Sequence, residues 1–344
     1  MSTIRSIAER ANVSIATVSK VLNGKNGVRE ETRQMILNVA QELNYRPNLN
    51  ARSLKSGRAR TIGIIAEDLT VFNTPEIIDG IAVSCDRVDY HYVLANLRIY
   101  KRFGHKMPEE KVLAEIVRDA IDVLLARQVV GIIYIGHHSH VIPFLPQFSE
   151  VPVVCAYCIC HELPSVIYDD ERASYDLTQL LINHGCRRIG MITGPLDSSH
   201  SASRSMGHMR ALFDNKIPYD PRLTLPGDWE RDIGYEIAGT LLNAGVDAIY
   251  AQNDVMAMGV LDYCNAVNVS VGRDLRLFGF DDREFSLVTR PRLSSVAPPL
   301  FEIGQTAADE LLQILAGGES KNQQIKLNCK IIERESSLGL EEKE

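Results

Sequence analysis

The chain has 344 residues, 45% of them hydrophobic, so it can bury a large core and is expected to form two or three domains. Its first twenty residues carry charges at Arg5, Glu9 and Arg10 and lack the apolar core of a signal peptide, and no later stretch approaches the roughly 20 apolar residues of a membrane span. Seven cysteines without regular spacing favour reduced thiols in the cytoplasm over a disulfide-stapled secreted protein.

The net charge of −7 is distributed unevenly along the chain. Residues 1–60 hold eleven Lys or Arg against four Glu, a net charge of +7, which leaves −14 on the remainder. Because nucleic acid is a polyanion, only the first sixty residues have the charge of a DNA-binding module.

Three short helices are predicted at the N-terminus. Asn12 tolerates a left-handed backbone and would end the first helix. Ser14 is a good N-cap for a second helix over residues 15–22, and Glu30 and Glu31 suit the first turn of a third. The apolar faces of the first and third helices have the spacing of one helical stripe and comprise Ile4, Ile7, Ala8 and Ala11, then Thr32, Ile36, Val39, Ala40 and Leu43.

Helices joined in this way indicate a helix-turn-helix, whose second helix enters the major groove of DNA. The alternative is a small helical bundle with a solvated surface. The side chains expected to face bases or the thymine methyl group are Ile15, Ala16, Thr17 and Lys20, and those expected to bond phosphates or base edges are Ser14, Ser19 and Asn23.

Three sequence runs resemble the head of the lactose-repressor (LacI/GalR) family of bacterial transcription regulators: TIRSIAERANVSIATVSKVLN at residues 3–23, ETR at 31–33 and LNYRPN at 43–48. The chain departs from the family pattern with Asn12 in place of a glycine and Arg29 in place of a Ser-type helix cap. The resemblance implies a DNA-binding domain at residues 1–46 and adds as DNA contacts Thr3, Asn48, Ala51 and Lys55.

The segment at residues 47–59 is too short for a stable isolated helix. In the resembled family it is a hinge helix, and the residue matching Leu54 is a wedge that enters the minor groove beside its twin from a second subunit. The alternative is a linker leucine packed on the next domain. A segment that folds only when two copies meet on DNA would respond to the spacing of the domains behind it.

From residue 61 onward, buried strands alternate with amphipathic helices, which predicts an α/β fold with parallel sheets. Ligands of such sheets bind at the carboxyl ends of the strands. The sequence has no G-x-G-x-x-G, G-x-x-x-x-G-K-[ST] or G-x-S-x-G motif, which opposes dehydrogenase, P-loop and α/β-hydrolase functions. The predicted strands are 61–66, 92–95, 129–135, 151–156, 166–168, 188–193, 247–251, 275–280, 294–297 and 330–333, and the predicted helices include 109–126, 171–184, 233–244, 254–266 and 303–315.

The resemblance continues through GCRRIGMITGP at residues 185–195 and AQNDVMAMG at 251–259. It implies a periplasmic-binding-protein-like body of two Rossmann-like subdomains that binds an effector and forms the dimer at residues 60–344. The chain would cross between the subdomains near residues 160, 292 and 326. The N-subdomain is then expected at about 60–160 plus 293–325, and the C-subdomain at about 161–292 plus 326–340.

Four residues match effector contacts of the resembled family: Arg204, Trp229, Asn253 and Asp281. A guanidinium and a carboxylate can each bind two neighbouring hydroxyls, an amide both donates and accepts, and an indole covers the apolar face of a sugar ring. Taken singly, these residues have structural alternatives, namely a surface ion pair, a core residue, a helix cap and a turn residue.

The first subdomain departs from the sugar-binding pattern. Glu67 and Asp68 stand where the lactose-type pocket has small hydroxyls, and Tyr157 stands where that pocket has an acidic residue. All three are retained as candidate effector contacts. The acidic pair would accept hydroxyl hydrogen bonds or an amino group of the effector, so the family supports a ligand without identifying it.

Two clusters of soft ligands follow neighbouring predicted strands and could bind Zn²⁺. Their spacing matches no zinc finger, and cysteines at strand ends are usually buried hydrophobes, so no metal and no other cofactor is expected. The clusters are His137, His138 and His140, then Cys158, Cys160 and His161.

The sequence therefore predicts a cytoplasmic homodimeric repressor of a carbohydrate-utilisation operon, controlled at a palindromic operator by a sugar. No heptad zipper follows Glu335, which favours a dimer over a tetramer. No acid–base pair or nucleophile indicates an enzyme. The alternatives are a repressor with a non-sugar co-repressor and a sugar-processing enzyme fused to a DNA-binding head. A transport receptor is opposed by the basic head and by the lack of a signal peptide.

Overall fold

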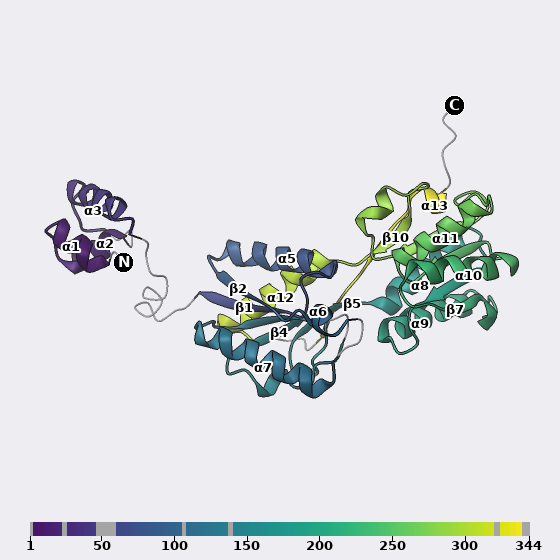
Figure 1. Ribbon diagram of the computed structural model, residues 1–344, viewed down its shortest axis with the longest axis horizontal. Coiled ribbons are helices and arrows are strands. Elements are labelled where there is room, and N and C mark those ends of the chain that lie inside the picture. The colour runs from purple at the N-terminus through teal and green to yellow at the C-terminus, as the bar shows by residue number, and fades with distance from the viewer. Residues whose placement is uncertain are drawn as a thin grey trace, which may run out of the picture. The chain divides into compact units, whose positions relative to one another are not determined.

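The computed structural model describes residues 3–22, 26–45, 60–104, 108–136, 140–319 and 324–338. The chain divides into two compact units, residues 1–59 and 60–344. The predicted fold class is confirmed, because a helical head precedes an α/β body with two sheets (Figure 1). None of the described helices is long and apolar enough to span a membrane.

The head consists of three helices around a small core. Asn12 has a φ of 49°, the left-handed conformation expected of the residue between the first two helices. Ser14 caps the second helix, because its Oγ accepts a hydrogen bond from the Thr17 amide at 3.0 Å. Ile7, Val18 and Ile36 are fully buried between the helices. The helices are α1 (Ile4–Arg10), α2 (Ile15–Leu22) and α3 (Glu30–Glu42).

The first sheet of the body has six parallel strands in the order β11-β5-β4-β3-β1-β2. Figure 1 shows α5 and α12 on one face and α7 on the other. The strands are β1 (Thr61–Ala66), β2 (His91–Asn96), β3 (Ile132–Ile135), β4 (Val153–Ala156), β5 (Ser165–Tyr168) and β11 (Gln324–Leu327). The helices are α5 (Asn73–Arg87), α6 (Ile99–Phe103), α7 (Glu110–Ala126), α12 (Leu300–Leu315) and the 3₁₀ turn η1 (Leu145–Gln147).

The second sheet has the order β12-β10-β9-β8-β6-β7 and is parallel except for the β10–β12 pair. Met191 packs toward α8 and α9, whereas the next residue, Ile192, packs toward α10 and α11, so helices cover both faces. The strands are β6 (Ile189–Thr193), β7 (Thr224–Pro226), β8 (Ala248–Ala251), β9 (Arg276–Phe280), β10 (Ser294–Ala297) and β12 (Lys330–Ile332). The helices are α8 (Asp170–Asn183), α9 (Ser199–Asp214), α10 (Arg231–Asn243), α11 (Asp254–Ala266), α13 (Glu335–Leu338) and the turns η2 (Pro221–Leu223) and η3 (Glu284–Leu287).

The chain crosses between the sheets after Tyr168, Ala297 and Leu327. The first two crossings lie later than the expected positions near 160 and 292, and the third agrees with the expected position near 326. The difference arises because β5 pairs with β4 in the first sheet and β10 pairs with β9 in the second. A buried strand has the same sequence pattern in either sheet, so the pattern does not show which sheet it joins. The first lobe therefore comprises residues 60–168 and 298–327, and the second lobe residues 169–297 and 328–338.

Helices α5 and α12 touch through their backbones. A Cβ atom on Gly80 would overlap the carbonyl oxygen of Phe301, and one on Gly304 would overlap that of Ile77. Only glycine permits so close an approach from both sides. The pair joins segments more than 200 residues apart and buries one face of the first sheet.

Candidate functional site

Two adjoining cavities lie between the lobes of the body. The first cavity measures about 440 Å³ and the second about 750 Å³. Five residues line both, namely Val71, Tyr100, Asp228, Trp229 and Glu230. The first cavity is further lined by Thr70, Phe72, Asn73, Tyr157, Arg204, Asn253, Val255, Asp281 and Arg283. The second is further lined by Glu67, Asp68, Ile99, Gly104, His140, Pro195, Asp197, Ser198, Ser199 and His200.

The structure thus brings all seven candidate effector contacts to one cleft. Trp229 belongs to both cavities. The second lobe contributes four of the candidates and the first lobe three, so the two sheets share the site. The remaining six are divided between the first cavity, with Tyr157, Arg204, Asn253 and Asp281, and the second, with Glu67 and Asp68.

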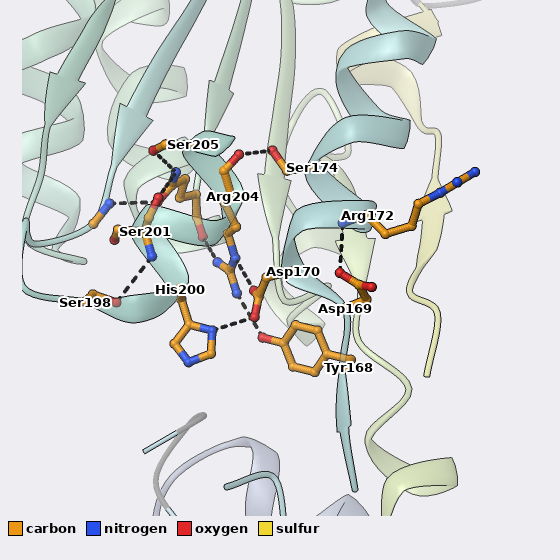
Figure 2. A network of polar contacts seen from close by, with 12 residues as sticks. Tyr168, Asp169, Asp170, Arg172, Ser174, Ser198, His200, Ser201, Arg204 and Ser205 are labelled. Atoms are coloured by element: carbon orange, nitrogen blue, oxygen red, sulfur yellow. Dashed lines mark hydrogen bonds and ion pairs between the residues drawn. The ribbon is translucent and has the colours of Figure 1, made fainter. Parts of the chain in front are cut away.

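Arg204 is the best buried of these side chains, with 2% of its surface exposed. Its Nε donates to Asp170 Oδ1 at 2.7 Å, and its Nη2 donates to the Tyr168 hydroxyl at 2.9 Å (Figure 2). Its Nη1 donates to the Gln252 carbonyl oxygen, and the guanidinium lies 3.5 Å from the centre of the Phe280 ring. Arg204 therefore forms a buried ion pair, not a surface one, and has one fixed position at the cavity wall.

Asp170 connects this arginine to a histidine. His200 Nδ1 lies 2.6 Å from Asp170 Oδ2, and both side chains are buried. Burial by itself raises the pKa of Asp170, but the charges and hydrogen bonds of Arg204 and His200 outweigh it and hold that pKa below the ordinary value. Asp170 is therefore ionised at neutral pH and fixes the start of α8 against α9.

The position of Trp229 depends on its backbone conformation and on Gly194, whose lack of a side chain leaves room for the indole ring. Trp229 has a φ of 75°, and its carbonyl oxygen accepts a hydrogen bond from Asn253 Nδ2 at 2.9 Å. Any Cβ at Gly194 would overlap the indole ring. Asn253 Oδ1 also accepts from the Met256 amide at 2.8 Å. Asn253 is thus the N-cap of α11, and its side chain also positions the indole of Trp229 at the cavity.

Asp281 follows β9 with a φ of 102°. Burial raises the pKa of its carboxyl group to about 8, although Arg204 acts in the opposite direction. The group is therefore mostly protonated at pH 7 and can donate as well as accept a hydrogen bond.

Asn73, the first residue of α5, was not among the candidates. It is 4% exposed, and its Oδ1 is buried without a hydrogen-bond partner in the described part of the chain. A buried amide oxygen without a partner is costly, which indicates that a ligand or water donates to it. An asparagine soon after the end of β1 is the sequence signal that could have identified it.

Tyr157 has a φ of 68°, and its ring lies 5.9 Å from that of Tyr168. Burial raises the pKa of Tyr157 well above its ordinary value, so the phenol stays neutral. Arg283, which also lines the first cavity, places its guanidinium 4.4 Å from the centre of the Phe72 ring. This cation–π contact joins the second lobe to the first.

The carboxylates of Glu67 and Asp68 accept hydrogen bonds from residues of their own lobe. Glu67 Oε1 accepts from the Tyr134 hydroxyl at 2.6 Å. Asp68 accepts from the Thr70 amide and hydroxyl at 2.9 and 2.6 Å, and from the Tyr100 amide at 3.0 Å. Burial alone raises the pKa of Asp68, but these hydrogen bonds lower it below the ordinary value. Both carboxylates therefore shape the loop after β1 while lining the second cavity.

Within the described residues no group of three His, Cys, Asp or Glu side chains is placed to hold a metal ion. His137 and His138 lie outside those residues. Cys158 and Cys160 are buried in the core of the first lobe, whereas His161 is exposed. The cysteines thus belong to the packing of the sheet.

Three of the candidate DNA contacts are exposed on α2. Ile15 is 51% exposed although it is apolar, and Ala16 and Lys20 are exposed beside it. Thr17 and Ser19 are half-buried. Ser14 is exposed while capping α2, and Thr3 is exposed while its Oγ1 caps α1 by accepting from the Ser6 amide at 3.2 Å. The candidates that lie outside the described residues are Asn23, Asn48, Ala51, Leu54 and Lys55.

Comparison with known proteins agrees with both parts of the chain. Residues 3–48 match the model of bacterial regulatory proteins of the lacI family, and residues 178–337 match a periplasmic binding protein-like domain. Catabolite control protein A of Streptococcus mutans is 32% identical over 96% of this chain and 97% of its own length.

Two solved structures extend the comparison. The lac repressor dimer bound to operator and the anti-inducer ONPF has a TM-score of 0.80 and 27% identity, covering 98% of this chain and 99% of its own. The complex of the transcriptional regulator CelR with cellobiose has a TM-score of 0.65 and 26% identity, covering 98% of this chain and 100% of its own.

Proposed function

Because this chain belongs to the LacI family of bacterial regulatory proteins, we propose that it is a cytoplasmic homodimeric repressor of a carbohydrate-utilisation operon. Two copies of α2 bind the half-sites of a near-palindromic operator, and a carbohydrate bound between the lobes sets the affinity. The related structures with operator and with cellobiose support the two halves of this proposal.

The observation that carries the effector assignment is the wall of the first cavity. An indole, a fixed guanidinium and a protonatable carboxyl group converge there, at Trp229, Arg204 and Asp281. Aromatic faces cover the apolar face of a sugar, and the polar groups bond its hydroxyls. Asn73 adds a buried acceptor without a partner in the described structure. Such a wall fits a polyhydroxylated ring better than an apolar ligand.

The DNA assignment depends on the exposed face of α2. Ile15 is half exposed at the start of the helix, and burying this apolar side chain against a thymine methyl group has no desolvation cost. Lys20 adds a cation on the same helix. We propose that the hinge at residues 47–59 inserts Leu54 into the minor groove and transmits closure of the lobes to the DNA. A coupling of about 1 to 3 kcal/mol would change operator affinity about 5- to 150-fold.

The test uses the full chain. Its operator is selected from genomic fragments, and affinity is measured by fluorescence anisotropy with and without each member of a sugar panel. We expect Ile15→Ala to lower specific affinity about 5- to 30-fold without changing stability, since the lost carbons contribute about 1 to 2 kcal/mol when they are buried against a thymine methyl group.

The matched control for Lys20→Ala is Lys111→Ala, which removes an exposed lysine at the start of α7 in the body. Lys20→Ala should alter base preference, and Lys111→Ala should leave it unchanged. Equal binding to every fragment under all conditions, with or without sugars, would contradict the proposal.

A further inference from the structure

The cleft is larger than one sugar ring needs. Cavities that hold a whole drug-sized ligand measure about 300 to 1,000 Å³. The first cavity, at about 440 Å³, and the second, at about 750 Å³, each fall within that range. A single hexose is smaller than a drug-sized ligand, so it would fill part of one cavity and leave the other to water.

The two cavities meet at aromatic side chains. Trp229 and Tyr100 line both, and Trp229 is fixed there by the hydrogen bond from Asn253 and by the absence of a side chain at Gly194. A fixed indole at the junction offers a stacking surface to a chain of rings that continues from one cavity into the next. The junction therefore favours a ligand that extends across it.

The first cavity contains the buried acceptor that marks one binding position. Asn73 Oδ1 has no partner in the described part of the chain, and Asn73 is 96% buried. A ligand hydroxyl would satisfy that oxygen, because a buried amide oxygen otherwise loses its hydration without compensation. One ring is thus placed against α5 and Trp229.

The second cavity is acidic. Glu67, Asp68 and Asp197 line it, together with the shared Asp228 and Glu230. None of the described residues lining it is a lysine or an arginine; the basic side chains there are histidines. Burial lowers the pKa of His140, so this side chain is neutral at pH 7. Carboxylates accept hydrogen bonds from hydroxyl groups and repel anions, which excludes a phosphate or an acid group from this cavity.

We propose that the effector is an oligosaccharide of at least two units, with one ring in each cavity and no phosphate, sulfate or carboxylate group on the ring in the second cavity. This inference rests on the proposed function, in that it takes the cleft to bind carbohydrate. It adds the length and the charge of the ligand, and it makes Asn73 and Asp197 specificity residues for two different rings.

Calorimetry on the full-length protein tests length and charge with matched probes. The series are glucose, maltose and maltotriose, then glucose, cellobiose and cellotriose, then xylose and xylobiose, with glucose 6-phosphate and maltose 6′-phosphate as charged partners. We expect the preferred disaccharide to bind at least about tenfold more tightly than its own monosaccharide. A tenfold difference in affinity corresponds to the contribution of about one hydrogen bond to a charged group. Maltose 6′-phosphate should bind more weakly than maltose, because the acidic second cavity repels a phosphate.

Two variants assign the rings. Asn73→Ala should weaken the monosaccharide and the disaccharide alike, by roughly tenfold. Asp197→Ala should weaken the disaccharide by a similar factor and leave the monosaccharide unchanged, since Asp197 lines the second cavity and makes no hydrogen bond within the described structure. Asp119→Ala, which removes an exposed carboxylate from α7, is the control and should change neither affinity.

A monosaccharide or sugar phosphate that binds as tightly as the best oligosaccharide would overturn this inference and leave the carbohydrate-responsive repressor standing. So would an Asp197→Ala variant with unchanged disaccharide affinity. If no neutral sugar of the panel binds or shifts operator affinity, the carbohydrate assignment itself fails, and the inference fails with it.

Discussion

The two lobes contribute to the cleft in different ways. In the second lobe, the candidate side chains are fixed by neighbours and still face the cavity: Asp170 holds Arg204, and Asn253 holds Trp229. In the first lobe, the carboxylate of Asp68 already accepts hydrogen bonds from its own loop. The buried oxygen that has no hydrogen-bond partner in the described structure is Oδ1 of Asn73. The second lobe thus supplies a rigid framework, and each lobe adds one group proposed to distinguish ligands, Asn73 from the first lobe and Asp197 from the second.

The largest expected effect comes from breaking the framework of the second lobe. Asp170→Ala leaves the Arg204 guanidinium buried without its counter-charge, which should lower the free energy of unfolding by about 3 to 5 kcal/mol. Urea denaturation followed by circular dichroism measures it. The double variant Asp170→Leu with Arg204→Met should regain most of the loss, because no buried charge remains. A loss under 1 kcal/mol for the single variant would contradict the role of Asp170 as the residue that compensates the buried charge of Arg204.

A smaller effect is expected in the loop of the first lobe. Asp68→Ala removes the acceptor of three hydrogen bonds and should cost about 1 to 3 kcal/mol at pH 7. Because the folded-state pKa lies below the ordinary 3.8, the stabilisation is present above that value and is lost as the pH falls through the folded-state pKa. Unfolding at pH 7 and pH 3 should therefore show the difference shrinking in acid. The exposed Asp79→Ala on α5 serves as control, and an equal loss at both pH values would contradict the assignment.

The smallest effect concerns Asp281, whose removal should stabilise the protein. Its pKa is about 8 when folded against an ordinary 3.8, so the folded state binds more protons and stability falls as the pH rises between these values. Asp281→Asn removes this loss. We expect a gain of about 1 kcal/mol, or 2 to 4 °C in Tm, at pH 8.5 and little gain at pH 5, measured by differential scanning fluorimetry. A gain independent of pH would mean that burial of the carboxyl group is not the cause.

Much of the fold could be predicted from periodicity. All ten predicted strands overlap observed ones, and β1 (Thr61–Ala66), β10 (Ser294–Ala297) and α11 (Asp254–Ala266) have the predicted bounds. The strands missed were β7 and β11, which have three and four residues. They lie at sheet edges and are only partly buried, so they lack the apolar run that marks a strand.

The candidate site was only partly predictable. Spacing and resemblance identified side chains that the structure brings to one cleft, including Arg204 and Trp229. They did not identify Asn73, because a partnerless buried oxygen exists only once α5 has packed in three dimensions. Nor could they show that Asp68 bonds the amide of Tyr100, a partner 32 residues away. Which polar groups are already satisfied is a property of the folded chain.

The contact of α5 with α12 through Gly80 and Gly304 has a consequence for biosynthesis. The ribosome makes α5 early, but its partner begins at Leu300, and the whole second lobe up to Ala297 is made in between. At about 5 to 20 residues per second, the apolar face of α5 waits about 7 to 30 s after β5 emerges before α12 can cover it. We expect the nascent first lobe to expose this apolar face, and to need protection by chaperones, until nearly the end of translation. Variants that weaken the contact of α5 with α12 should then reduce yield in cells more than they reduce stability in vitro.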